Sequence, residues 1–385
     1  MTTKHKHIKV AFCIPNMVIG GVETVFVNTV NELLKNHNLD ITIITHAKIR
    51  ESVYVDWLKS HPELPVFVYY PMCNWFEDLA PKCRGILKPI RRILFSLYKK
   101  YRRVILYRKF RDIDVFVDYK NFEFFKELHH LDKPKIAWVH SSLFYCESND
   151  VFSHLPQYTK IVAITDEFVD DFRAKHPQYA NKIVRIYNPL DVKDIQSKAK
   201  LATSPRGKYF CHVSRLVDGK DIKTLLDGFD LFAKSHKNIK LYIVGDGNKA
   251  REFKEYAGKL KSAKQIVFIG ALDNPFGLMH GAIANILSSE HEGFGMVLTE
   301  SMALRTLIIS SDYKCGAKEI LENGKNGLLF EIGNAQMLAD CMSKALDSKF
   351  KEKLIQRAYK SLSRFSVNKM TKQITDLLQL FGGNE

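Results

Sequence analysis

Two glutamates, Glu292 and Glu300, lie on either side of a glycine turn and have the chemistry of a sugar-binding pair. A carboxylate accepts two hydrogen bonds side by side, which suits the neighbouring hydroxyls of a sugar or a ribose. The apolar run 284–287 predicts a buried strand before the turn, and residues 296–304 have the spacing of a helix. A helix N-terminus behind a glycine turn attracts anions. The stretch therefore predicts a cradle for a nucleotide and a sugar.

Two cations stand at a comparable place earlier in the second half of the chain. Arg215 and Lys220 lie in a loop between a predicted strand, 208–213, and a predicted helix, 221–235. A guanidinium binds a phosphate through two parallel hydrogen bonds, and an ammonium adds a point charge. Together they would neutralise a diphosphate and the charge that grows on it as a leaving group.

The first half opens with a similar strand, glycine loop and helix. Residues 8–14 predict a strand, the loop ends at Gly20 and Gly21, and helical apolar spacing follows. These glycines allow a backbone to approach a substrate or a phosphate closely. His140 follows another predicted strand, 135–139, and ligands of open α/β sheets bind at that edge. We therefore expect His140 to belong to the site.

The order of the predicted elements is that of an α/β protein with two Rossmann-like domains. Strands and helices alternate through both halves, and 385 residues suffice for two cores of ordinary size. After Asn-Pro-Leu-Asp at 188–191, the polar tract 191–208 is expected to be a hinge. The expected strands are 8–14, 40–45, 66–70, 115–119, 135–140, 161–165 and 183–187, then 208–213, 240–244, 265–269, 284–287, 307–311 and 328–330.

The motifs resemble a known family. Glu292-x7-Glu300, with Gly-Phe-Gly after the first glutamate, resembles the E-x7-E signature of retaining glycosyltransferases of family 4, the glycosyl transferases group 1, which have the GT-B fold. The sequence SRLVDGKD at 214–221 is similar to the family's Arg-x4-Lys element. GGVETVFVNTVNELL at 20–34 is similar to its glycine loop, and Asn-Pro-Leu-Asp at 188–191 to its linker. The resemblance is strongest over residues 209–330.

Two positions depart from the family pattern. The family usually has a Gly-x-Pro turn where this chain has Arg305-Thr306-Leu307. It often has an arginine before Glu-Ile, where this chain has Lys318. Both departures concern the selectivity for the donor rather than the fold.

The resemblance implies two domains that face a cleft, with the last helix crossing back to the first domain. The first domain would then be 1–190 with about 365–385, and the second 191–364. A nucleotide-diphosphate sugar would bind mainly to the second domain and a glycan or lipid-linked acceptor to the first. Transfer would retain the sugar's configuration without a bound metal or cofactor, and no D-x-D metal site is evident in the sequence.

The resemblance also assigns roles to residues. Arg215 and Lys220 would bind the diphosphate, Glu300 the ribose and Glu292 the transferred sugar, with His140 as a further catalytic residue. The expected catalytic residues are Glu292, His140, Arg215 and Lys220. The expected donor-binding residues are Gly20, Gly21, Arg215, Lys220, Glu292, Gly293, Phe294, Gly295, Met296, Val297, Leu298 and Glu300.

Most of the net charge of +16 lies in one segment, since residues 82–111 hold twelve lysines and arginines and no acidic residue. Apolar residues at 86, 90, 93, 94, 97, 101, 104 and 105 form one helical stripe there. A basic amphipathic helix over 84–111 favours an anionic membrane surface, at about 1 kcal/mol per well-placed cation. The alternatives are a core helix with a solvated basic face and a nucleic-acid surface, for which no motif is present. The cations expected at the membrane are Arg91, Arg92, Lys99, Lys100, Arg102 and Arg103.

Other functions stay open at this point. Residues 245–250 fit a G-x-G-x-x-A dinucleotide fingerprint, which suggests an oxidoreductase, but no acidic residue ends the next strand. Within the GT-B fold, an epimerase and a soluble sugar synthase are alternatives, and a non-catalytic basic membrane adaptor is another. UDP and GDP donors are not distinguished. The favoured function is glycosyl transfer in cell-surface polysaccharide or lipopolysaccharide synthesis.

The composition indicates where the protein works. No signal peptide is evident, and no apolar run approaches the roughly 18 residues of a spanning helix. Seven scattered cysteines without a C-x-x-C pair indicate reduced thiols and no zinc site. We therefore expect a cytoplasmic protein that is peripheral on the inner face of the cytoplasmic membrane.

Overall fold

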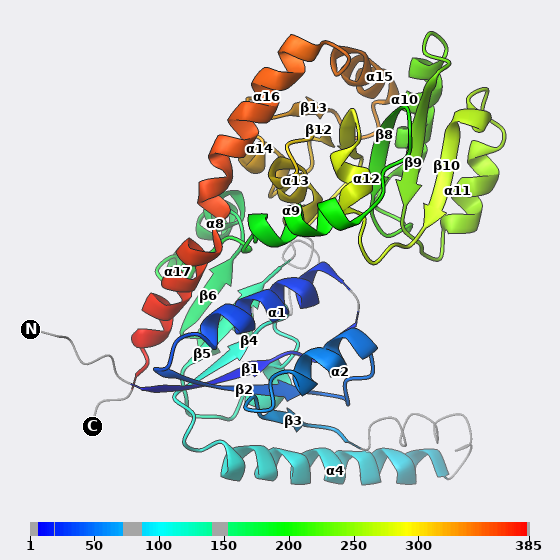
Figure 1. The fold of residues 1–385 in the computed structure, drawn as a ribbon. Coiled ribbons are helices and arrows are strands. Elements are labelled where there is room, and N and C mark those ends of the chain that lie inside the picture. Colours follow the sequence, from blue (N-terminus) through cyan, green and yellow to red (C-terminus); the bar gives the residue numbers. More distant parts are fainter. Residues whose placement is uncertain (1–6, 19, 72–86, 141–152, 383–385) are drawn as a thin grey trace, which may run out of the picture.

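The computed structural model describes residues 7–18, 20–71, 87–140 and 153–382, which form two α/β domains (Figure 1). In the described part of the first domain, the parallel strands are ordered β3-β2-β1-β4-β5-β6-β7. In the second domain the order is β10-β9-β8-β11-β12-β13. This confirms the predicted fold class.

The first domain's strands are β1 (Ile8–Cys13), β2 (Leu39–Thr45), β3 (Val66–Val68), β4 (Val115–Asp118), β5 (Lys135–Val139), β6 (Lys160–Ala163) and β7 (Ile183–Arg185). Its helices are α1 (Gly21–Leu33), α2 (Ser52–Lys59), α4 (Leu87–Lys109), α5 (Phe125–Leu128) and α8 (Asp166–Lys175).

The second domain repeats the plan of alternating strands and helices. Its strands are β8 (Lys208–Val213), β9 (Ile239–Val244), β10 (Ile266–Gly270), β11 (Ala284–Leu287), β12 (Leu307–Ser311) and β13 (Leu328–Phe330). The helices from the linker onward are α9 (Val192–Leu201), α10 (Ile222–Ala233), α11 (Ala250–Ala257), α12 (Phe276–His280), α13 (Met296–Ala303), α14 (Ala317–Ile320), α15 (Ala335–Lys344), α16 (Ser348–Ser361) and α17 (Val367–Gln379).

Each sheet reverses its strand order beside its first strand. β1 lies between β2 and β4, and β8 lies between β9 and β11. Ligands of doubly wound sheets bind outside the carboxyl ends of the strands at such a reversal. The loop with Gly20 and Gly21 follows β1, and the loop from Arg215 to Lys220 follows β8. The topology thus places both predicted loops where a ligand is expected.

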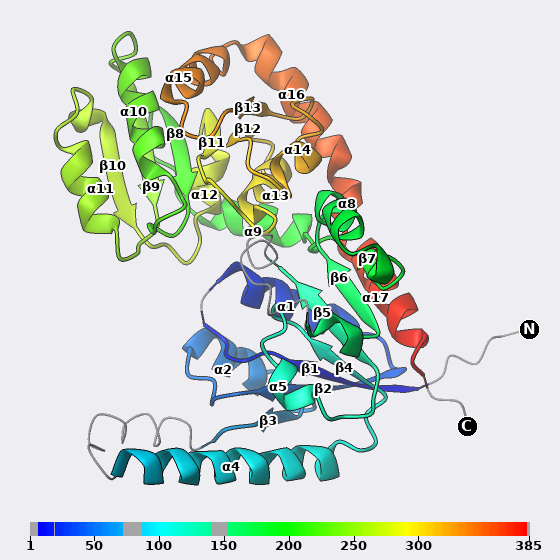
Figure 2. The same ribbon diagram turned by 180° about the vertical axis from the view of Figure 1, so that it is seen from behind.

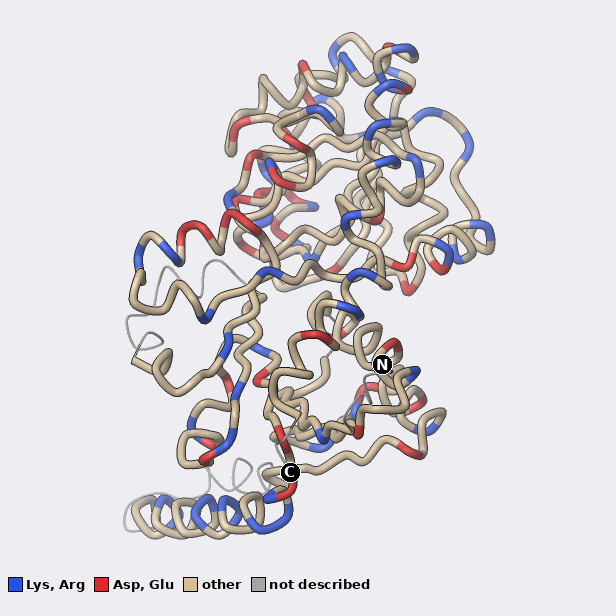
Figure 3. The backbone as a smooth tube through the Cα atoms, turned by 90° about the vertical axis from the view of Figure 1, so that its left-hand side faces the viewer, with Lys and Arg blue, Asp and Glu red and all other residues tan. Residues whose placement is uncertain are grey.

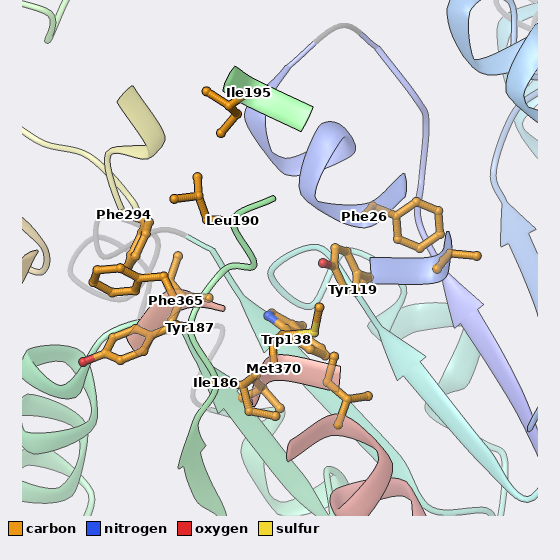
Figure 4. Packing of buried hydrophobic residues seen from close by; sticks show 14 of the residues in the cluster. Phe26, Tyr119, Trp138, Ile186, Tyr187, Leu190, Ile195, Phe294, Phe365 and Met370 are labelled. Carbon is orange, nitrogen blue, oxygen red and sulfur yellow. The ribbon is translucent and has the colours of Figure 1, made fainter. Parts of the chain in front are cut away.

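Aromatic side chains fill the core of the first domain and continue into the linker (Figure 4). Phe26 packs edge-on against Tyr119 at 5.0 Å between ring centroids. At the domain junction, Tyr187 packs against Phe365 at 5.0 Å, and Phe294 of the second domain lies 6.0 Å from Tyr187. One hydrophobic cluster therefore continues from one domain to the other.

The chain crosses between the domains twice, and the two crossing segments lie side by side. Leu190 and Ser366 form a parallel bridge, and the backbone N–H of Leu190 donates to the carbonyl of Phe365 at 2.9 Å. The last helix, α17, then packs against α1 of the first domain (Figure 1). This confirms the predicted return of the C-terminal helix.

The prediction of a hinge over residues 191–208 is wrong for most of that length, because residues 192–201 form helix α9. The Asp191 side chain accepts a hydrogen bond from the Asp194 N–H and starts the helix. Ile195 and Ala199, one turn apart, are its buried residues. The irregular link between the domains is therefore shorter than the sequence indicated.

Candidate active site

The glycine turn between β11 and α13 has the shape that the sequence predicts. Gly295 caps α13 with a left-handed backbone, φ +85°, which favours glycine. A Cβ added there would lie 2.1 Å from the Tyr313 hydroxyl, so no larger residue fits without displacing that ring. The Tyr313 hydroxyl donates to the Phe294 carbonyl at 2.9 Å. Tyr313 thus holds the turn on one side, and residues 293–295 line the cleft.

Glu292 lies at the start of this turn and is paired with Lys220. The Lys220 ammonium lies 2.5 Å from the Glu292 carboxylate, and both side chains are about 15% exposed. The Ser289 hydroxyl donates to the same carboxylate oxygen at 2.6 Å. The structure therefore brings the first glutamate of the signature into contact with the predicted phosphate cation.

The loop that carries Lys220 is tied to the loop that carries Glu292. The Ser288 hydroxyl donates to the Lys220 carbonyl at 2.9 Å, and the Glu290 N–H donates to the Gly219 carbonyl at 3.0 Å. Gly219 has φ +81°, and a Cβ there would lie 2.7 Å from the His291 ring. These contacts fix the two loops as one unit above the ends of β8 and β11.

Glu300 lies about one turn into α13 and is half-buried. Burial raises the pKa of its carboxyl to about 7, so the group is close to half-protonated near neutral pH. A protonated carboxyl both donates and accepts a hydrogen bond, which fits the two hydroxyls of a ribose. The second glutamate thus differs from Glu292 in its state as well as its place.

His140 directly follows β5 and lines the cleft from the first domain. Its backbone N–H donates to the Asn121 side chain at 2.8 Å, and its ring lies 4.8 Å from the Tyr119 ring. Burial lowers the pKa of His140 to about 3, so the imidazole is neutral at physiological pH. A neutral imidazole can accept or donate a hydrogen bond but cannot supply a positive charge.

The predicted residues of both domains meet in one cleft of about 320 Å³. The first domain contributes Gly21 and His140, and the second contributes the cations and the glycine turn. The predicted residues that line it are Gly21, His140, Arg215, Lys220, Glu292, Gly293, Phe294, Gly295, Met296 and Val297. Among the described residues, no cluster of His, Cys, Asp or Glu is arranged to hold a metal ion.

Three predicted donor residues do not line this cleft. Leu298 was predicted to bind the donor, but its side chain is 1% exposed in the core and its N–H donates to the Gly295 carbonyl at 2.9 Å. The Glu23 carboxylate occupies the space beside Gly20, 2.8 Å from where a Cβ would lie. Glu300 lies deeper along α13.

Asn188 is a lining residue that the sequence analysis missed as part of the site. It is 5% exposed, lines the cleft beside Ile164 and Val22, and its amide oxygen has no hydrogen-bond partner in the described part of the chain. The Asn-Pro-Leu-Asp motif had indicated a linker only. Its place in the linker could have indicated a lining residue, since a linker between two facing domains passes the cleft between them.

A protein-family model matches the second domain. Residues 193–361 match the family model described as glycosyl transferases group 1. The match covers most of the second domain. This confirms the resemblance drawn from Glu292, Glu300, Arg215 and Lys220.

Two curated relatives are similar over about half of this chain. One is the N-acetylgalactosamine-N,N'-diacetylbacillosaminyl-diphospho-undecaprenol 4-alpha-N-acetylgalactosaminyltransferase of Campylobacter jejuni, 27% identical over 46% of this chain and 47% of that protein. Another is the lipopolysaccharide 1,6-galactosyltransferase of Salmonella typhimurium, 27% identical over 51% of this chain and 54% of that protein. The chain spans about half the length of these curated relatives.

Solved structures match the whole fold. Anabaena HepE in complex with UDP has a TM-score of 0.75 at 17% identity, over 97% of this chain and 100% of that one. The apo form of the lipopolysaccharide outer core galactosyltransferase WaaB has a TM-score of 0.71 at 19% identity, over 97% and 99%. At these identities the likeness establishes the GT-B fold, in which the group 1 domain is the second of the two.

The dinucleotide fingerprint has a structural role in this group 1 domain. A Cβ on Gly245 would lie 1.8 Å from the Ser214 carbonyl, and one on Gly247 would lie 2.3 Å from the Leu216 carbonyl. The turn therefore packs against the loop that carries Arg215 instead of facing open space for a pyrophosphate. Its glycines support the cation loop.

Helix α4 lies outside the group 1 segment and runs along the base of the first domain beside β3 (Figure 2). Its apolar stripe faces solvent, so the alternative of a buried core face is wrong for this stripe. Leu97, at 55%, and Tyr101, at 63%, are typical exposures. Figure 3 shows its basic residues as a band at the foot of the molecule. The exposed stripe consists of Ile90, Ile93, Leu94, Leu97, Tyr101 and Val104.

The predicted membrane cations of α4 divide into two groups. Arg92, Lys99 and Lys100 are exposed, whereas Arg91, Arg102 and Arg103 are half-buried. Arg102 donates to the carbonyls of Tyr69 and Val68 at 2.6 and 2.7 Å. It therefore fastens the helix to the first domain. The predicted range 84–111 begins with residues that lie outside the described part.

No helix in the described ranges combines the length and the apolar character that crossing a membrane requires. The four described cysteines, at 13, 211, 315 and 341, are buried and free.

Proposed function

We propose that this chain is a retaining glycosyltransferase that moves a sugar from a UDP-sugar to a glycan or lipid-linked acceptor. The observation that carries the proposal is the single cleft in which Arg215, Lys220 and Glu292 of the second domain face His140 of the first. The comparisons support UDP as the nucleotide, because HepE was solved with it. The names of the curated relatives support a role in lipopolysaccharide or other cell-surface glycan synthesis.

The residues divide the work of the reaction between binding and charge stabilisation. Arg215 and Lys220 bind the diphosphate and stabilise the negative charge that develops as it leaves. Glu300 binds the ribose hydroxyls, and Glu292 binds the transferred sugar. The neutral His140 contributes a hydrogen bond from the first domain, where the acceptor binds.

The pairing of Lys220 with Glu292 shapes the order of these contacts. In the donor-free protein their charges neutralise each other across 2.5 Å. A bound diphosphate competes for the ammonium, while the hydroxyls of the sugar take its place beside the carboxylate. Both contacts strengthen as the bond to the leaving group breaks, so the pair acts mainly on the transition state.

A second part of the proposal is that α4 docks on an anionic lipid bilayer. The exposed stripe includes Ile93, Leu94 and Leu97, at 51–59% exposure, and Arg92 and Lys100 of the same helix are also exposed. A helix with this pattern lies in the membrane interface, where its apolar side enters the lipid and its cations meet anionic headgroups. This would place the acceptor domain at the membrane, which suits a lipid-linked acceptor.

The proposal is tested by incubating the protein with a panel of nucleotide sugars. Thermal shift identifies the donor, and ligand at 100 times Kd should stabilise by about 2.7 kcal/mol. Incubation with the donor alone then separates transfer from epimerisation, because an epimerase converts the donor without an acceptor. Turnover with an acceptor should survive a chelator. Absence of stabilisation by every UDP-sugar would leave a non-catalytic membrane adaptor as the better description.

A further inference from the structure

We propose that Glu167 and Glu319 form a reciprocal clasp between the domains that positions the donor turn, residues 293–295. The inference rests on the proposed transfer reaction, in which groups from both domains must meet one sugar. It concerns positioning residues, since neither carboxylate lines the cleft.

The first half of the clasp runs from the second domain to the first. Glu319 belongs to α14, and both of its carboxylate oxygens accept from the Asp166 N–H at 2.9 Å. One of them also accepts from the Glu167 N–H at 3.2 Å. These N–H groups are in the first turn of α8, where they have no partner within the helix and a negative charge is favourable. A carboxylate of one domain therefore caps a helix of the other.

The second half runs in the opposite direction. The Glu167 carboxylate accepts from the backbone N–H of Cys315 at 2.7 Å. Cys315 has a left-handed backbone, φ +64°, which directs its N–H out of the turn that precedes α14. Each domain thus supplies one carboxylate to the backbone of the other.

Residues 313–316, which include Cys315 of the clasp, also contact the donor turn. The Tyr313 hydroxyl donates to the Phe294 carbonyl at 2.9 Å, and Tyr313 is 1% exposed. A Cβ added to Gly316 would lie 2.7 Å from the same carbonyl, so the backbones of the two segments touch. Residues 313–316 are therefore held between α8 on one side and the donor turn on the other.

A second route joins the same places through aromatic rings (Figure 4). The Phe294 ring is 3% exposed and lies 6.0 Å from Tyr187 and 5.6 Å from Phe365. The Tyr187 hydroxyl donates to Asp166 at 3.1 Å, in the turn that Glu319 caps. Because both routes link α8 to Phe294, a shift of α8 moves the donor turn by way of packed groups.

The test uses substitutions at the interface and a matched control on α8. Glu319→Ala removes the cap, whereas Glu319→Gln keeps an oxygen that can accept from the N–H groups. Asp170→Ala removes an exposed acidic residue from the same helix without touching the clasp. Hydrogen exchange is followed by mass spectrometry in peptides that cover 163–172 and 290–300, without ligand.

We expect Glu319→Ala to raise exchange at least fivefold in both peptides, Glu319→Gln to raise it less, and Asp170→Ala to leave it unchanged. A rise confined to 163–172 would mean local capping only and would overturn the proposal. Should Glu319→Ala fail to fold, Glu319→Gln and Glu167→Gln must still raise exchange in 290–300, or the proposal is wrong. This readout needs no catalysis, so it stands apart from the proposed function.

Kinetics provide the second readout. The clasp predicts that Glu319→Ala lowers kcat for transfer at least tenfold while Kd for UDP changes less than threefold, because the nucleotide contacts lie within the second domain. Glu319→Gln should recover most of kcat. Equal losses of kcat and UDP affinity, without recovery by glutamine, would indicate general damage and contradict a positioning role.

Discussion

At the scale of single residues, the two signature glutamates differ in what they contact. Glu292 is bound by Lys220 and Ser289, whereas Glu300 lies apart from them along α13. The same residue type therefore has two electrostatic environments eight positions apart. Each environment leads to a separate prediction.

Replacing Glu292 by glutamine should reduce kcat on the order of 10²–10³-fold, because a group that stabilises developing charge is lost. UDP affinity should change little or improve, since Lys220 is released from its partner. Radiolabelled transfer and calorimetric UDP binding measure the two quantities. Glu290→Gln is the control, because Glu290 is exposed two residues away. Full activity of the Glu292 variant would remove this residue from the mechanism.

Replacing Glu300 by glutamine should make the ligand-free protein more stable at pH 8 than the wild type. The folded-state pKa of about 7 lies above the usual 4.5, so the wild type loses stability as the pH rises from 4.5 to 7 and stays less stable above. The difference at pH 8 should be about 1–3 kcal/mol and should shrink toward pH 5. Thermal unfolding at both pH values tests this, and an equal difference at both would contradict a raised pKa. UDP affinity should fall in the same variant.

At the scale of elements, the donor turn depends on a glycine for two separable reasons. Gly295→Ala meets both a left-handed backbone and the Tyr313 hydroxyl, whereas Gly333→Ala meets only the backbone, φ +76°, in open space. The control should lose about 1–2 kcal/mol of stability from backbone strain. The Gly295 variant should lose more, because the Tyr313 hydroxyl must also move. Adding Tyr313→Phe, which removes the obstructing oxygen, should recover part of the loss; equal behaviour of the two alanine variants would argue against a steric role for Tyr313.

Helix α4 supports a prediction about lipid. Wild-type protein should sediment with vesicles that contain anionic lipid and stay in solution with neutral vesicles, and raised salt should weaken the binding. Reversing the charge at Arg92, Lys99 and Lys100 should abolish sedimentation while UDP binding survives. Arg102 is left intact because it holds the helix to Val68 and Tyr69.

The apolar stripe of α4 requires its own variant. Ile93→Ser with Leu97→Ser should also prevent sedimentation with anionic vesicles. Leu201→Ser with Leu380→Ser removes two apolar side chains that are 84% and 67% exposed elsewhere, and should have no effect. Wild-type protein that stays in the supernatant with anionic vesicles would refute membrane docking.

These elements also show how far the sequence could be followed. Strands and helices with strong apolar periodicity, and the motifs around Glu292 and Arg215, were predictable because local patterns determine them. Helix α9 was not, because only Ile195 and Ala199 are buried in a polar segment and its packing comes from α12 and α13. The periodicity of α4 predicted an amphipathic helix, but periodicity alone does not reveal which side faces solvent.

At the scale of the whole molecule, the unpredicted features are those that join the domains. Asn188 enters the cleft because the two sheets face each other, and no local pattern contains that fact. Glu319 contacts Asp166 across 153 positions of sequence. Contacts of this kind depend on how the two domains are placed, which only the folded chain determines.

The pairing of Lys220 with Glu292 has a consequence for selectivity among anions. In the proposed reaction Lys220 binds phosphate, and Glu292 is already its counter-ion, so the attraction for a small free anion such as inorganic phosphate should come mainly from Arg215. An ion that replaces Glu292 as the partner of Lys220 leaves a carboxylate without a counter-charge beside it, which opposes the exchange. Only a ligand that brings hydroxyl groups to Glu292 and phosphate oxygens to Lys220 satisfies both at once. The Lys220–Glu292 ion pair should therefore open for a sugar joined to a diphosphate and stay closed to inorganic phosphate alone.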